Sequence, residues 1–118
     1  MSPNPAVRIL AKLEMYTRRG QSRIVPEIFD PTVLDGKYLV SNRDAIAALR
    51  DLVFREGIFG GPSCGAVLAA AARVAKVMDS GTIVALLPDG GWKYLSAGTF
   101  TRELDEMEED LEGGVNWW

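Results

Sequence analysis

A continuous apolar run at residues 82–87, with the sequence TIVALL, constrains the fold more than any other feature. Uncharged runs of this length that are rich in β-branched residues are typical of strands buried on both faces of a parallel sheet. Parallel strands need crossover connections, which helices normally supply. The run therefore predicts an α/β fold with residues 82–87 as a central parallel strand.

Two helical patterns precede this predicted strand. Ser41 and Asp44 fit a capping box, and Gly57 is well placed to end the helix that follows. One face of this helix carries apolar residues at helical spacing: Ala45, Ile46, Leu49, Leu52 and Val53. The second pattern is an alanine-rich segment at residues 66–78 that is apolar on most sides, which predicts a buried helix.

The other elements predicted from the sequence are shorter. Residues 7–14 alternate apolar and polar positions and predict a strand, and short strands are also expected at 38–40 and 58–60. A last helix is expected at 101–111, with Leu104, Met107 and Leu111 facing inward. We therefore expect one domain over 1–118: a small three-layer α/β fragment with a short, mostly parallel sheet, βαβαβ-like, flanked by helices.

Composition excludes several kinds of site. The 118 residues include no histidine and one cysteine, Cys64. Catalytic triads, most zinc sites and an internal disulfide are therefore excluded, and no metal is expected. The net charge of −3 argues against nucleic acid as a partner. No signal peptide or membrane-spanning run is visible, so a cytoplasmic location without membrane contact is expected.

Two glycine-containing turns are the candidate sites. The first, GGPSCGA at 60–66, lies between a predicted strand and a helix, where free amides attract an anion or acceptor atom. Ser63 there is either a ligand contact or a helix cap, and Cys64 is either a stabilised thiolate or a small buried residue. The second, at 88–96, would lie on the same rim. Asp89 there either contacts a ligand or forms the turn.

The two turns also carry a family resemblance. The sequence EGIFGGPSCGAVL at 56–68 resembles the "EGI-x-x-G-x-S-S/T-G-A" signature of the pyridoxal-phosphate (PLP) cysteine synthases and cystathionine β-synthases of fold type II. Residues 82–96 resemble the family's strand and its "YLST" turn. The Gly-Trp-Lys-Tyr-Leu-Ser version and the tryptophan tail are similar to a branch that includes enzymes using O-phosphoserine and a sulfur-carrier protein.

The resemblance implies cofactor contacts. Ser63 aligns with the serine whose hydroxyl bonds the pyridine nitrogen of PLP, and Gly61, Gly65 and Asp89 are expected to join it in the cofactor-binding set. The implied activity is β-replacement on O-phosphoserine or O-acetylserine, the transferase step of cysteine biosynthesis.

Other parts of the family pattern are missing. Residues 7–14 resemble an early strand that precedes the Schiff-base motif, and the following sequence puts Arg23 where the lysine belongs. Arginine stays protonated and cannot form the aldimine. The "T-S-G-N-T-G" and "G-T-G-T-G/T" loops of the family are also skipped, so that the family's C-terminal part resumes at residue 24. No catalytic residue is therefore assigned, and PLP binding is expected only of the parent family.

Three functions remain open at this point. The chain is an inactive, truncated homologue, or a regulatory module that pairs with a full-length synthase, or an enzyme whose site is completed by another chain. The first is preferred because catalysis needs positioned groups. The apolar helix at 66–78 lacks the cover of a complete domain, so self-association or a poorly packed monomer is expected.

Overall fold

The computed structural model describes residues 30, 32, 34–36 and 38–107. The chain divides into two compact units, Met1–Leu39 and Val40–Trp118, and each is described by itself. In the first unit the Thr32 hydroxyl and backbone N–H donate hydrogen bonds of 2.6 and 2.9 Å to Asp30 Oδ1. These bonds lower the pKa of Asp30. The strand predicted at 7–14 and the position of Arg23 lie outside the described residues.

Helix α1 (Asn42–Glu56) forms as the sequence predicts. The Ser41 hydroxyl accepts a hydrogen bond of 3.1 Å from the backbone N–H of Asp44 and caps the first turn. Gly57 ends the helix with a φ of 69°, a left-handed conformation that glycine adopts without steric cost. The expected inward face is confirmed: the buried residues are Ala45, Ile46, Leu49 and Leu52, and Val53 packs beside them.

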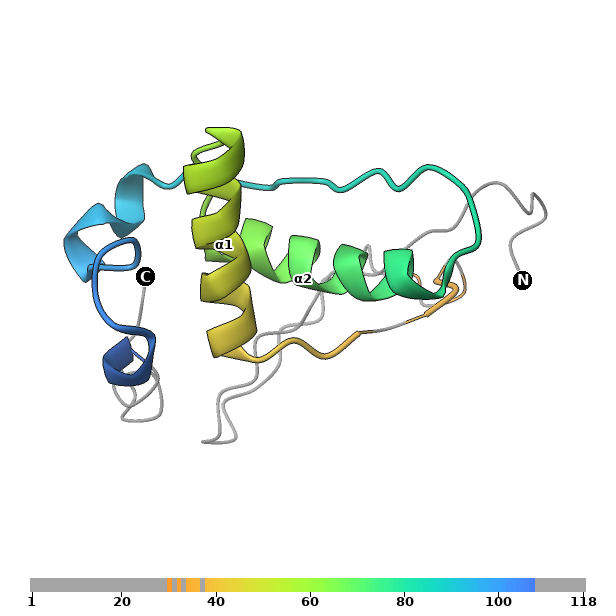
Figure 1. Ribbon diagram of the computed structural model, residues 1–118, viewed down its shortest axis with the longest axis horizontal. Helices are drawn as coiled ribbons and strands as arrows, with labels where there is room; N and C mark the ends of the chain where they lie inside the picture. The colour runs from red at the N-terminus through yellow and green to blue at the C-terminus, as the bar shows by residue number, and fades with distance from the viewer. Residues whose placement is uncertain (1–29, 31, 33, 37, 108–118) are drawn as a thin grey trace. The chain divides into compact units, whose positions relative to one another are not determined.

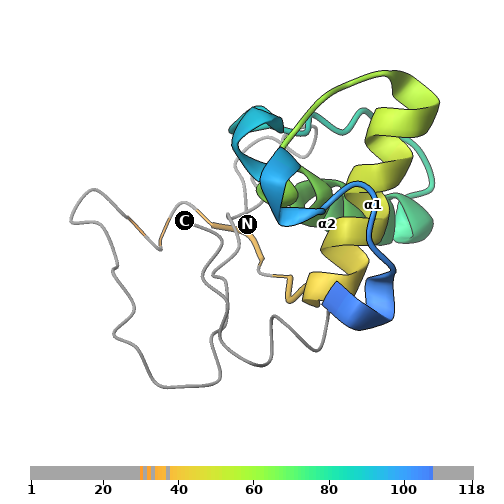
Figure 2. The same cartoon turned by 90° about the vertical axis from the view of Figure 1, so that its left-hand side faces the viewer.

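Helix α2 (Pro62–Val77) begins four residues earlier than predicted. Gly61 is its N-cap and Pro62 its first residue, a position where the missing N–H of proline costs no hydrogen bond. Figures 1 and 2 show α1 crossing over α2, and the two helices meet where Gly65 lies against Ala45 and Leu49. The buried cluster around this crossing contains Leu49, Leu52 and Cys64, with Leu68, Leu87 and Phe100 at its edge.

The predicted central strand is not paired. Residues 82–87 run as an extended segment along α2 (Figure 1), and among the described residues only an isolated antiparallel bridge joins Gly60 to Gly90. The expected parallel sheet is therefore not formed by residues 38–107, and 38–40 and 58–60 form no strands. A strand needs neighbours to complete its hydrogen bonds, and the described part of the chain contains none for 82–87.

The segment after the bridge differs from the sequence prediction. Residues Trp92–Ala97 form a 3₁₀ helix, η2, that ends at Gly98 with a φ of 71°. The helix predicted at 101–111 is described only as a helical turn at 104–107, where Met107 is buried as expected. Its continuation and Leu111 lie outside the described residues. No helix in the described part of the chain is long and apolar enough to cross a membrane.

Candidate functional site

The two turns singled out in the sequence lie against each other. The backbone N–H of Gly61 donates to the Asp89 carbonyl oxygen at 3.1 Å, and the N–H of Gly91 donates to the Phe59 carbonyl oxygen at 3.1 Å. These two bonds hold the start of α2 beside the end of the extended segment. The prediction that both turns share one rim is therefore correct, although the pairing that joins them is antiparallel rather than parallel.

Asp89 is the centre of this rim. Its carboxylate Oδ2 accepts a hydrogen bond of 2.7 Å from the Tyr94 hydroxyl and lies 3.6 Å from the Lys93 ammonium. The thiol of Cys64 donates to the Asp89 carbonyl oxygen at 3.2 Å. Because the Lys93 side chain is largely exposed, this ion pair contributes little to stability. The partly buried bonds to Tyr94 and Cys64 therefore fix the geometry, and they tie η2 to the start of α2.

Among the residues of the rim, Tyr94 has the one pKa that departs strongly from its usual value. The residue is 5% exposed, and burial raises the pKa of Tyr94 from 10.0 to about 12, with the hydrogen bond to Asp89 adding to the rise. The phenol is therefore neutral across the physiological range and acts as a hydrogen-bond donor to Asp89.

Alkaline pH tests this arrangement. The folded chain disfavours the tyrosinate form, so the stabilisation from Tyr94 is complete below pH 10 and is lost as the pH rises toward 12. In Tyr94→Phe the free energy of unfolding should fall less steeply over this interval, and one late tyrosinate step should vanish from the ultraviolet titration. If the step that is lost in Tyr94→Phe lies near pH 10 rather than late in the titration, the proposed contact is contradicted.

The remaining predicted site residues have different surroundings. Cys64 is fully buried, which confirms the interpretation as a small buried residue. Gly65 faces α1: a Cβ there would lie 1.9 Å from the Ala45 carbonyl oxygen, so the glycine is needed for helix packing. Ser63 lies half-buried in the first turn of α2, after the N-cap, so it does not cap the helix. The cofactor contacts assigned to Ser63, Gly61, Gly65 and Asp89 stay predictions.

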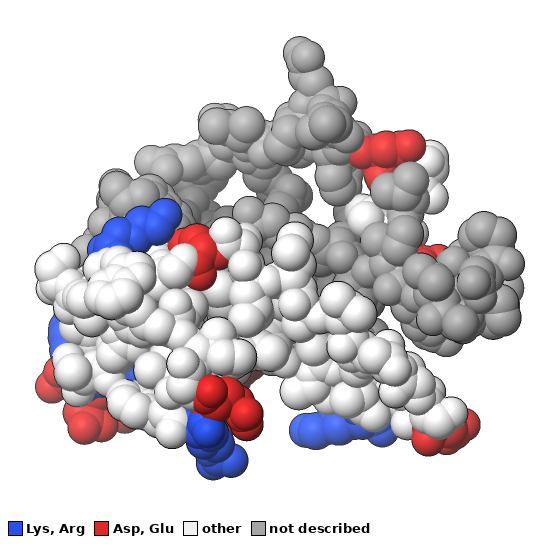
Figure 3. Space-filling view, turned by 90° about the horizontal axis from the view of Figure 1, so that it is seen from above, with Lys and Arg blue, Asp and Glu red and all other residues white. Residues whose placement is uncertain are grey.

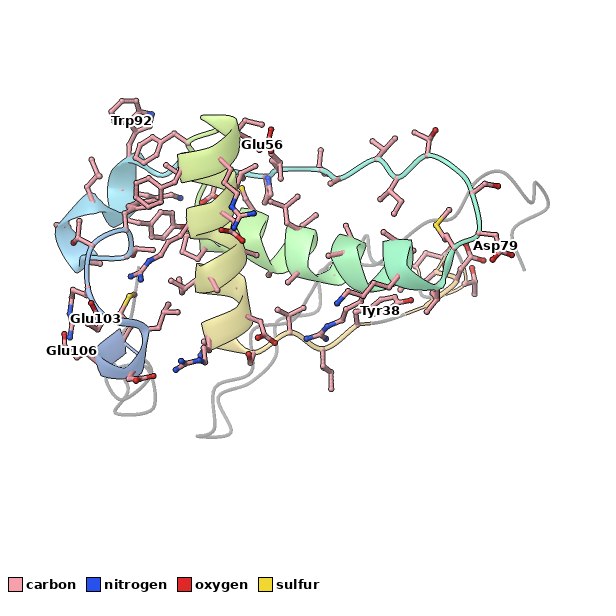
Figure 4. All side chains as sticks on the ribbon, in the orientation of Figure 1. Tyr38, Glu56, Asp79, Trp92, Glu103 and Glu106 are labelled. Atoms are coloured by element: carbon pink, nitrogen blue, oxygen red, sulfur yellow. The ribbon has the colours of Figure 1, made fainter. Side chains whose placement is uncertain are left out.

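An aromatic cluster beside the rim was missed in the sequence. The ring of Phe59 packs edge-on against Trp92 at a centroid distance of 4.9 Å and lies 5.1 Å from the ring of Phe100. Trp92 nevertheless remains 76% exposed, and Figure 4 shows its side chain pointing outward from η2. The 3₁₀ conformation that aims this ring has no clear sequence signal apart from Gly98.

Comparison with known proteins places these elements in a family. The model of the pyridoxal-phosphate dependent enzymes matches residues 12–89, about two thirds of the chain. The chain belongs to this family. The match includes α1, α2, the extended segment and Asp89, so it covers most of the described rim.

Individual relatives narrow the similarity to cysteine synthases. Cysteine synthase B of Escherichia coli is 41% identical over 86 residues, which are 73% of this chain and 28% of that protein. Cysteine synthase of Aquifex aeolicus is 37% identical over 109 residues, covering 83% of this chain and 33% of that protein. The chain thus spans about a third or less of the length of these relatives.

A solved structure supports the same assignment. The crystal structure of an O-ureido-L-serine-bound lysine-to-alanine mutant of O-ureido-L-serine synthase matches with a TM-score of 0.61 and 34% identity. The match covers 78% of this chain and 30% of that one. The arrangement around α1 and α2 is therefore that of one part of a larger PLP-enzyme fold.

The described residues fit one contact of PLP and not the whole cofactor. Ser63 forms no hydrogen bond within the described part of the chain, so its hydroxyl is available to a ring nitrogen at the start of α2. The two lysines described, Lys76 and Lys93, are poorly placed for a Schiff base. Lys76 follows Ser63 by 13 residues on α2, which places the two residues roughly 20 Å apart along the helix. Lys93 pairs with Asp89. A complete PLP site is not present among these residues.

Proposed function

We propose that this chain is a non-catalytic member of the cysteine synthase group, which keeps one folded part of the parent enzyme. The observation that carries the proposal is the position of the described lysines. Lys93 is engaged by Asp89 at the rim, and Lys76 lies at the far end of α2. The family's chemistry uses a lysine that holds the cofactor as a Schiff base, and neither residue is positioned to replace it.

The sequence supports this proposal independently. The sequence passes from residues 7–14 to the family's C-terminal part at residue 24, and the family's substrate and phosphate loops have no counterpart between them. When bound, PLP supplies the electron sink for β-elimination and β-replacement. In this chain the residues of the rim instead hold one another: Tyr94 and Cys64 bind Asp89, and Gly61 binds its carbonyl oxygen.

An activity measurement tests the proposal. The purified chain, supplied with PLP, sulfide and either O-acetylserine or O-phosphoserine, is expected to form cysteine no faster than a reaction without protein. Cysteine synthase B of Escherichia coli serves as the positive control under the same conditions. Sulfide-dependent cysteine formation that scales with the concentration of the chain, and that is lost in Lys93→Arg, would overturn the proposal and make Lys93 a substitute Schiff-base residue.

A second function is favoured by one observation. Large apolar side chains remain exposed in the described unit, among them Val84, Leu86 and Trp92. A complete domain normally covers such groups, so the chain is suited to associate with a full-length synthase as a regulatory fragment. Co-purification of the two proteins, together with a change in the activity of the synthase, distinguishes this function from that of an inactive remnant.

A further inference from the structure

We draw no further inference here: the strongest candidate, the exposed apolar row of the extended segment at 82–87 on the mainly uncharged face that Figure 3 shows, carries none because nothing in the structure shows which partner covers it.

Discussion

Gly65→Ala is expected to break the packing of α1 on α2. An added Cβ would lie 1.9 Å from the Ala45 carbonyl oxygen and 2.8 Å from Leu49 Cβ, and both of these atoms belong to buried residues of α1. Relief requires the two helices to move apart at the point where the core cluster forms. Because overpacked core substitutions cost about 1–3 kcal/mol and occasionally more, a loss of about 3 kcal/mol is expected. Urea unfolding followed by circular dichroism measures it.

A substitution at an open glycine is the control. No atom lies within 4 Å of a Cβ built on Gly36, so Gly36→Ala should change the free energy of unfolding by less than about 1 kcal/mol. If Gly65→Ala and Gly36→Ala unfold at the same urea concentration, the close approach of α2 to α1 does not exist as described.

Arg50→Met is expected to release the segment after η2. The Arg50 Nε donates to the Thr99 carbonyl oxygen at 3.0 Å, and its Nη2 donates to the Arg102 carbonyl oxygen and to Met107 Sδ, the latter at 3.4 Å. These contacts hold 98–107 against α1. Methionine keeps the apolar stem but removes the guanidinium donor from both carbonyl groups, which should cost about 2–3 kcal/mol because hydrogen bonds to charged groups are the stronger kind. Unfolding in urea should show this loss.

The control for Arg50 lies on the same helix. Arg55 pairs with Asp51 at 3.2 Å, and the two side chains are 75% and 65% exposed. Arg55→Met should therefore change stability by no more than about 0.5 kcal/mol. Limited proteolysis measures the release of this segment directly. The rate of cleavage within 98–107 should increase in Arg50→Met and stay unchanged in Arg55→Met. Equal behaviour of the two variants would contradict the role of Arg50.

Local signals in the sequence predicted α1 well. Ser41, Gly57 and the apolar spacing between them act within one helix, so their effect does not depend on distant residues. The alanine-rich pattern predicts a start of α2 at residue 66, four residues too late, because 61–65 has the composition of a turn. A proline at the first helical position is itself a start signal, and Pro62 marks the true boundary.

Non-local pairing explains what the sequence could not predict. The apolar character of 82–87 predicts a strand, but whether a strand joins a sheet depends on neighbours, which the described residues do not supply. The same limit applies to Arg50, an arginine on a helix with no local sign that it bonds carbonyl groups about 50 residues away. The sequence gives a chain's local preferences more reliably than its long-range contacts.

The two turns of the candidate site lie together in the structure, but the sequence did not predict the contacts that hold them. The resemblance and the glycine-containing turns both indicated the start of α2 and Asp89, and the structure brings these two places together. The sequence did not predict that Asp89 would be held by Tyr94 and Cys64, because these bonds depend on the 3₁₀ conformation of η2. Gly65 illustrates a second difficulty, since a glycine in a family signature can serve packing within the fold.

Borohydride reduction in the presence of PLP tests the central claim most directly. The chain is titrated with PLP, its visible spectrum is followed, and the reduced protein is mapped for modified lysines. For a non-catalytic chain we expect the spectrum of free cofactor and no lysine that is modified in preference to the others. A saturating band that borohydride locks onto one lysine, Lys93 above all, would contradict it, because the chain would then hold the cofactor by a Schiff base of its own.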